Sequence, residues 1–153
     1  MDTLGSILLP YGYPGLFLAS FLASTVLPLG SEGVVILLIA RNFNIFSVVL
    51  VATVGNYLGA CTSYYIGLAG RTQLIGKYLH INASQMEHAR VWFEKYGSWS
   101  LLLTWVPVLG DALPVVAGMM KLKFGLFSIL VFAGKLLRYG ALAYLVHTGI
   151  GIL

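Results

Sequence analysis

Four ionisable side chains lie in otherwise apolar stretches of the sequence: Glu32, Asp111, Lys135 and Arg138. In a membrane protein an uncompensated charge at mid-bilayer costs about 3 kcal/mol, so such residues usually pair with each other or face water. Two acids and two bases balance, and Lys135 and Arg138 are spaced i and i+3, on one face of a helix. A guanidinium binds an anion through two parallel hydrogen bonds, and an ammonium binds it as a point charge. We therefore expect Lys135 and Arg138 to bind an anionic headgroup beside the two carboxylates.

The two carboxylates could also carry protons. A carboxylate removed from water is harder to ionise, so Glu32 or Asp111 could couple transport to a proton gradient. A second interpretation is that the four charges form a neutral network that serves folding or partner binding. A third is an intramembrane aspartyl hydrolase, in which two carboxylates share a proton and activate water. Gly110-Asp111 resembles part of its Gly-x-Gly-Asp motif, but Val108 replaces the first glycine and the partner acid is a glutamate.

The composition of the 153-residue chain predicts a membrane environment. Hydrophobic residues make up 59% and charged residues 9%, and the mean hydropathy is +0.90, whereas a soluble domain is about one quarter charged. A cytosolic enzyme is therefore excluded. The net charge of +4 does not indicate nucleic-acid binding, because the basic residues do not cluster on a polar face. Nucleotide, zinc and serine-nucleophile motifs are absent, so we expect no cofactor and no metal; Asp2, where a secretory signal would be basic, predicts no cleaved signal peptide.

Two charge-poor segments are long enough to cross a membrane. Residues 42–70 contain no charge and no proline, and a spanning helix needs about 20 apolar residues. Residues 122–150 are equally long, with Lys135 and Arg138 in the middle. Small residues recur along the first segment at near-helical spacing, which predicts close approach of another helix; they are Ala52, Gly55, Gly59, Ala60, Ser63 and Gly67.

Two other apolar segments predict re-entrant hairpins. Pro10 and Pro14 interrupt the first charge-free run, and the apolar segment after Glu32 makes only about 12 Å of helix, too short for a hydrocarbon core of about 30 Å. The segments before and after Pro107 are similarly short. Such hairpins are stable at membrane depth only when protein or a water-filled cavity covers their tips, which we place at Pro28, Gly30, Pro107 and Gly110. The alternative is a kinked helix with the acid at the membrane interface, and if the hairpins cross fully the chain has six spans.

A shift of 79 residues relates the two halves of the chain. It aligns Thr25-x-x-Pro28-x-x-x-Glu32 with Thr104-x-x-Pro107-x-x-x-Asp111, and it places Asn56 opposite Lys135. We therefore predict one all-α integral membrane domain, 1–153, built as an inverted repeat. Repeat 1 covers about 15–70 and repeat 2 about 98–150, and each consists of a hairpin followed by a spanning helix. Asn56 is then a third candidate for headgroup binding.

Residues 71–97 join the two repeats and form the most polar part of the chain. Ser84 and Glu87 have the spacing of a capping box, and Gly97 is suited to end the helix. The pattern in between is amphipathic and predicts an interfacial connector helix. Basic residues gather in this connector and at 121–123, so the positive-inside rule places this side in the cytoplasm and both termini on the other side.

Two motifs are fairly specific: Trp105-x-Pro107-Val108-x-Gly110-Asp111 and Gly134-Lys135-x-x-Arg138-Tyr139. On these residues the sequence resembles the YqaA-type branch of the DedA superfamily, which includes the SNARE-associated Golgi (VTT) proteins. The resemblance implies facing re-entrant hairpins and, in a bacterium, an inner-membrane location. It also implies a non-enzymatic scramblase or transporter of anionic phospholipid or polyprenyl phosphate, proton-dependent in some members. Typical members carry arginines where Thr104 and Gly110 stand, so we expect Lys135 and Arg138 to supply the positive charge.

Overall fold

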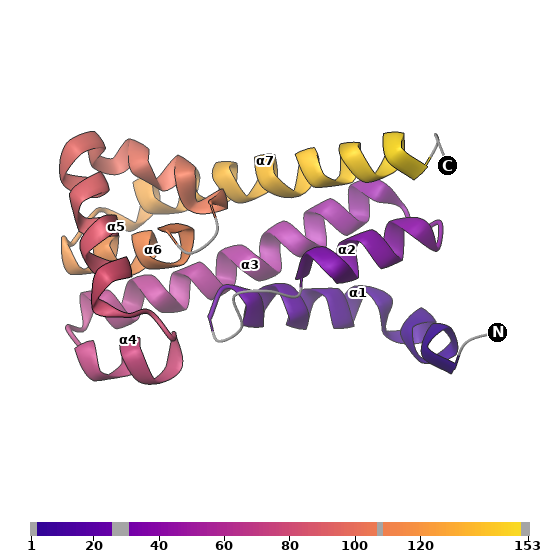
Figure 1. Ribbon diagram of the computed structural model, residues 1–153, viewed down its shortest axis with the longest axis horizontal. Helices are drawn as coiled ribbons and strands as arrows, with labels where there is room; N and C mark the ends of the chain where they lie inside the picture. Colours follow the sequence, from indigo (N-terminus) through magenta and orange to yellow (C-terminus); the bar gives the residue numbers. More distant parts are fainter. Residues whose placement is uncertain (1–2, 26–30, 107–108, 151–153) are drawn as a thin grey trace.

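The computed structural model describes residues 3–25, 31–106 and 109–150. Within these ranges all regular secondary structure is helical, as the sequence predicted. The elements, labelled in part in Figure 1, are α1 (Thr3–Ala23), α2 (Ser31–Ala40), α3 (Ile45–Leu68), α4 (Thr72–Tyr78), α5 (Ala83–Tyr96), the 3₁₀ helix η1 (Gly97–Trp105), α6 (Leu109–Met119) and α7 (Phe124–Ile150).

Helices α3 and α7 form the long axis of the molecule. Both are long and apolar enough to cross a membrane, with 24 and 27 residues. At 1.5 Å per residue these lengths are about 36 and 40 Å, more than the hydrocarbon core of about 30 Å. The Tyr57 hydroxyl of α3 donates a hydrogen bond of 2.7 Å to Ser128 Oγ of α7. The two candidate spans coincide with the two that the sequence predicted.

The outer side of α7 is apolar. Ile129, Leu137 and Tyr144 recur at intervals of seven or eight residues, close to the 7.2 residues of two helical turns, and their exposed fractions are 70, 67 and 69%. A water-soluble monomer rarely exposes a continuous apolar surface of this kind. Lipid is therefore the solvent that fits this face of the molecule.

The shorter helices form two pairs at opposite ends of the long axis (Figure 1). The pair α1 and α2 packs against the N-terminal half of α3, at the end of the molecule where α1 begins and α7 ends. The pair η1 and α6 lies at the other end, near α4 and α5. The C-terminal end of α1 and the N-terminal end of α6 both lie toward the middle of the molecule. The two pairs thus approach the centre of the long helices from opposite directions.

Helix α1 corrects one prediction. Pro10 and Pro14 do not end the helix, because α1 includes both. Proline inside a helix removes a backbone hydrogen bond and bends the axis, and Figure 1 shows α1 changing direction near its N-terminal end. In apolar surroundings neighbouring helices and local adjustment satisfy the freed backbone groups, so proline is tolerated there.

Small residues let α3 contact its neighbours closely. The predicted small residues of this helix are all buried. A Cβ atom on Gly55 would lie 2.7 Å from the carbonyl oxygen of Phe17 in α1, and one on Gly67 would lie 2.1 Å from that of Val115 in α6. Both distances are too short for a real Cβ atom, so these helix spacings require glycine. The predicted close approach along this stripe is confirmed.

The connector consists of two helices, α4 and α5, and its cap differs from the predicted one. Asn82, not Ser84, caps α5. Its side-chain oxygen accepts a hydrogen bond of 2.8 Å from the backbone N–H of Gln85, and the Gln85 side-chain oxygen accepts one of 2.9 Å from the backbone N–H of Asn82. The box therefore begins two residues earlier, because the asparagine already satisfies the first free amides. Gly97 ends α5 with φ 63°, as predicted.

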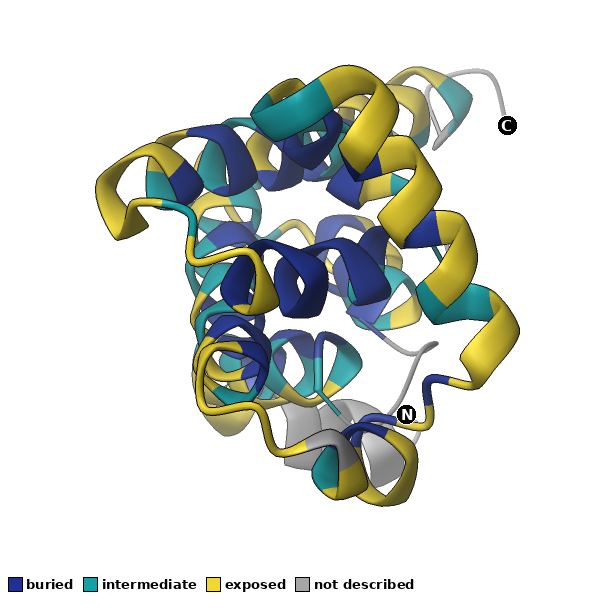
Figure 2. Ribbon diagram, turned by 90° about the vertical axis from the view of Figure 1, so that its left-hand side faces the viewer, coloured by how far each residue is buried: buried dark blue, intermediate teal, exposed yellow. Residues whose placement is uncertain are grey.

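The second helical pair lies deep in the fold. Helix α6 is buried along residues 112–118, and a Cβ atom on Gly118 would lie 2.0 Å from the carbonyl oxygen of Tyr64 in α3. Ala89 and Phe93 of α5 join the same apolar cluster. Figure 2 shows this arrangement, with buried residues on the inner sides of the helices and exposed residues on the outer sides.

Candidate functional site: a charged cluster between the two helical pairs

Glu32 and Arg138 form an ion pair that joins α2 to α7. Glu32 lies in the first turn of α2, where the helix dipole favours a negative charge, and Arg138 lies midway along α7. The two side chains are 28% and 20% exposed. At this depth each charge compensates the other, and removing one partner leaves the other poorly solvated.

A buried tyrosine is linked to this pair through a serine. Ser31 Oγ lies 3.4 Å from Glu32 Oε2 and 2.8 Å from the hydroxyl of Tyr139. Since the carboxylate can only accept, Ser31 donates to Glu32 and Tyr139 donates to Ser31. Tyr139 has no exposed surface, and the Arg138 guanidinium carbon lies 5.8 Å from its ring centroid. One chain of contacts therefore fixes the orientation of Glu32.

Asn56 lies in the interface of α1 and α3 beside this chain. It is 2% exposed, its amide nitrogen donates a hydrogen bond of 3.1 Å to the Ser20 carbonyl oxygen, and both Asn56 and Ser20 approach the Tyr139 hydroxyl. One side of the Asn56 amide is thus already used to join two helices. Its proposed contact with a headgroup stays a prediction.

Lys135 lies one helical turn before Arg138 and faces the second helical pair. Among the described residues it is the one charged side chain with no exposed surface. Its ammonium donates a hydrogen bond of 3.2 Å to the carbonyl oxygen of Thr104, near the end of η1. Asp111, in the first turn of α6, is near enough to attract this charge but forms no direct ion pair with it. Each cation of α7 therefore faces one acid, and each acid belongs to a different helical pair.

Buried polar atoms without partners surround this cluster. Ser20 Oγ, Asn56 Oδ1 and Thr104 Oγ1 have no exposed surface and no hydrogen bond with any residue in the described ranges. A buried polar group without a partner costs about 1–3 kcal/mol, and water molecules satisfy most such groups in proteins. Ser20 and Asn56 lie on the Tyr139 side of the cluster, and Thr104 binds Lys135, so water at these atoms would hydrate both halves of the cluster.

Of the four predicted hairpin-tip residues, one can be described. Gly110 is buried, and a Cβ atom on it would lie 2.3 Å from the Thr104 carbonyl oxygen, so η1 and α6 contact each other backbone to backbone there. Pro28, Gly30 and Pro107 lie outside the described residues.

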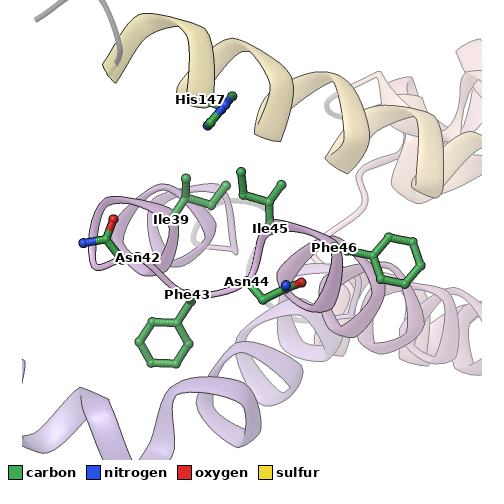
Figure 3. Close-up of a pocket in the computed structure, with 7 residues that line it drawn as sticks. All are labelled: Ile39, Asn42, Phe43, Asn44, Ile45, Phe46 and His147. Carbon is green, nitrogen blue, oxygen red and sulfur yellow. The ribbon is translucent and has the colours of Figure 1, made fainter.

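A second polar site lies at the end of the molecule where α1 begins. A cavity of about 540 Å³ is bounded by the turn between α2 and α3 and by the last part of α7 (Figure 3). Its polar side chains are Asn42, Asn44 and His147. Two asparagines in a turn and one distant histidine form no pattern along the chain, so these residues could not be recognised from the sequence.

The structure also adds residues to the main cluster that sequence reasoning missed. Ser31 and Tyr139 are next to Glu32 and Arg138 in the sequence, so adjacency to a predicted charge was the available signal. Ser20 and Thr104 gave no signal of this kind. Among the described residues, no three His, Cys, Asp or Glu side chains lie close enough to bind a metal ion together.

Comparison with known proteins identifies the family. The model of the VTT domain matches residues 27–148, which include all four charged residues of the cluster. The chain belongs to the VTT-domain family of the DedA superfamily.

This VTT-domain chain has bacterial relatives of similar length. It is 36% identical over 131 residues to the inner membrane protein YqaA of Escherichia coli, covering 84% of this chain and 86% of the relative. It is 34% identical over 142 residues to an uncharacterised protein of Haemophilus influenzae, covering 85% and 84%. The apolar helices and these relatives establish an integral membrane protein of the inner-membrane type.

A more distant relative has a functional name. The VTT-domain chain is 23% identical over 137 residues to the undecaprenyl phosphate transporter A of Staphylococcus aureus, covering 81% of this chain and 67% of the relative. No solved structure shows significant similarity.

Proposed function

We propose that this protein is a membrane transporter or scramblase that moves the headgroup of an anionic lipid across the bilayer while the hydrocarbon chains stay in lipid. The substrate class is an anionic phospholipid or a polyprenyl phosphate, the latter in keeping with the named relative. The observation that carries the proposal is the ion pair between Glu32 and Arg138, with Lys135 one turn away, at the place where two helical pairs approach from opposite ends.

In this proposal the two helical pairs are re-entrant hairpins of an inverted repeat. Helices α2 and α6 contain 10 and 11 residues, about 15 and 16 Å, which is half of a hydrocarbon core of about 30 Å. Backbone that ends at mid-membrane must be covered by protein or water, and the burial of residues 112–118 is consistent with this requirement. Repeats at about 15–70 and 98–150 would then have opposite orientations.

Arg138 is the residue that we expect to bind the headgroup. Its guanidinium is paired with Glu32 and partly exposed, so an incoming phosphate competes with the carboxylate for the same donors. When phosphate takes those donors, Glu32 loses its counterion, and a proton on Glu32 removes the unpaired negative charge. Binding of the lipid anion is thereby coupled to uptake of one proton at Glu32. Lys135 and Asp111 would repeat this exchange on the side of η1 and α6.

The basic connector defines the orientation in the membrane. Six basic residues belong to the end that contains α4 and α5, whereas Arg41 belongs to the opposite end; the six are Arg71, Lys77, Arg90, Lys95, Lys121 and Lys123. By the positive-inside rule the connector faces the cytoplasm and both termini face away from it. An alkaline phosphatase fused to Leu153 should be active, and an inactive fusion at normal abundance would reverse the orientation.

Reconstitution in liposomes tests the transport proposal. Vesicles of phosphatidylcholine contain a trace of fluorescent phosphatidylglycerol, or of fluorescent polyprenyl phosphate, and dithionite bleaches the label in the outer leaflet. We expect wild-type protein to expose the inner-leaflet label to bleaching, and Arg138→Gln to stop this. Arg90→Gln is the matched control, because Arg90 is exposed on α5 and contacts only Glu87 and Glu94 among the described acids. Bleaching no faster than in empty vesicles would refute the proposal.

A structural role for the charged cluster is the second candidate. The observation in its favour is that both cations of the cluster already have partners: Arg138 is paired with Glu32, and the buried Lys135 donates a hydrogen bond to the Thr104 carbonyl oxygen. Exchanging the pair, Glu32→Lys with Arg138→Glu, separates the two functions. If the pair is purely structural, the exchanged variant should keep both its normal abundance and its wild-type function. If the pair is a headgroup site, the variant should keep its abundance and lose transport.

A further inference from the structure

The cavity near the end of α7 is separate from the charged cluster. It lies between Asn44 and Ile45, where α3 begins, and His147, in the last turn of α7. Both spanning helices therefore leave the apolar core at this level. A cavity at this depth faces the boundary between hydrocarbon and water in whichever leaflet contains it.

Each polar side chain of this cavity offers a hydrogen-bond donor. The Asn44 side-chain oxygen accepts a hydrogen bond of 3.0 Å from the Ser47 backbone amide, and the NH₂ group of Asn44 supplies two donors. Asn42 offers a second amide, and His147 offers a ring N–H. Figure 3 shows His147 facing Ile39 and Ile45 from α7, with Asn42 and Asn44 in the turn on the other side. None of the described residues that line the cavity is acidic.

The remaining lining is apolar. Ile39, Ile45 and Phe46 form the side of the cavity next to the spanning helices, and Phe46 is 75% exposed. At about 540 Å³ the cavity is within the size range of ligand sites, which combine apolar walls with a few converging polar groups. The ligand that fits has acceptor oxygens at one end and hydrocarbon at the other. Arg41, directly before Asn42, adds a positive charge at this end of the molecule.

We propose that this cavity binds the phosphate group of a membrane lipid in the leaflet on the side of the chain termini, at Asn42, Asn44 and His147. Because the two amides and the imidazole lie on different walls of the cavity (Figure 3), different oxygen atoms of the lipid headgroup accept hydrogen bonds from them, and the first part of the hydrocarbon chain lies against Ile45 and Phe46. The inference rests on the proposed function only for its ligand class. In a transport cycle the cavity is where the lipid waits before reaching Arg138, or after leaving it.

Photolabelling tests the site directly. The full-length protein is reconstituted in phosphatidylcholine vesicles that contain a photoactivatable phosphatidylglycerol with the reactive group in its headgroup, and labelled peptides are identified by mass spectrometry. We expect labelling of residues 39–46 above the level of other lipid-facing segments. The double variant Asn42→Ala with His147→Ala removes two hydrogen-bond donors to the charged phosphate, so it should reduce this labelling by about tenfold or more. His88→Ala, an exposed histidine at the opposite end, should not change it.

The outcomes separate this site from the transport proposal. Uniform labelling along all lipid-facing helices, or unchanged labelling in the double variant, would overturn the cavity proposal. If millimolar inorganic phosphate suppressed the labelling, the ligand of this site would be free phosphate and not a lipid. Arg138→Gln should stop transport and leave labelling intact; labelling that persists in a wild-type protein with no transport would refute the transport function and leave the cavity site standing.

Discussion

Breaking the ion pair between Glu32 and Arg138 should cost more stability than breaking a surface pair of the same chemical type. Removing one partner of a fully buried pair costs about 3–5 kcal/mol, because the remaining charge has lost its compensation. Here the two side chains keep 28% and 20% exposure, so water recovers part of that loss, and we expect about 2–3 kcal/mol for Glu32→Gln. That is about a 30- to 150-fold change in the folding equilibrium.

A double-mutant cycle gives the measurement. Glu32→Gln, Arg138→Gln and the double variant are unfolded in detergent micelles by adding sodium dodecyl sulfate, and the free energies of unfolding are compared. Because the double variant leaves no charge uncompensated, it should be less destabilised than the sum of the single variants, with a coupling of about 1–3 kcal/mol. The same cycle on Glu87 and Arg90 is the control. These residues form an equivalent acid–arginine pair on the exposed face of α5, and their coupling should be too small to resolve.

Additive losses at Glu32 and Arg138 would refute the reasoning. Such a result would mean that each charge finds its own water in the folded protein, and that the contact between them is incidental. A coupling as small as that of Glu87 and Arg90 would lead to the same conclusion.

Three further changes have defined outcomes. Gly118→Ala should destabilise the protein by about 2 kcal/mol or more, because the new Cβ would lie 2.0 Å from a carbonyl oxygen of α3. Tyr139→Phe should lose about 1 kcal/mol of unfolding free energy through one buried hydrogen bond and should alter the pH profile of transport. The hydrogen bond from Arg90 holds the pKa of Glu87 below its ordinary value of 4.5, so its contribution to stability is present above pH 4.5 and is lost as pH falls through the lowered pKa.

Each of these predictions has its own control. Gly140→Ala introduces a methyl group with no atom within 4 Å and should stabilise α7 slightly; equal effects of the two glycine substitutions would contradict the packing argument. An unchanged pH profile of transport in Tyr139→Phe would mean that the tyrosine contributes to stability alone. For Glu87, NMR titration should show its pKa return toward 4.5 in Arg90→Ala, and no change on that substitution would remove Arg90 as the cause.

The sequence predicted the parts of the fold that follow from local chemistry. The absence of charge located α3 and α7, and the spacing of small residues located the contacts of Gly55 and Gly67. The sequence also indicated that Glu32 and Arg138 need compensating charges, because a charge in an apolar segment is conspicuous without any knowledge of the fold. These properties depend on one segment at a time.

Properties that depend on two distant segments were not predictable. Pro10 and Pro14 indicated an interruption because the local rule assumes water as the solvent, whereas tertiary packing and lipid let the helix continue. Thr104 contributes its backbone carbonyl oxygen to Lys135, and a backbone acceptor leaves no trace in residue type. Asn42 and His147 are 105 positions apart in the sequence, and only the folding of α7 alongside the α2–α3 turn brings them to one cavity.

The two long helices are constrained by different properties of their side chains. Helix α3 is constrained by size, because glycine, alanine and serine line its contacts, and α7 is constrained by charge, because it contains the buried Lys135 and the partly exposed Arg138. A saturation mutagenesis scan should therefore give two different tolerance profiles. On α3 larger side chains should not be tolerated, whereas on the inner face of α7 the substitutions that are not tolerated should be those that remove a positive charge.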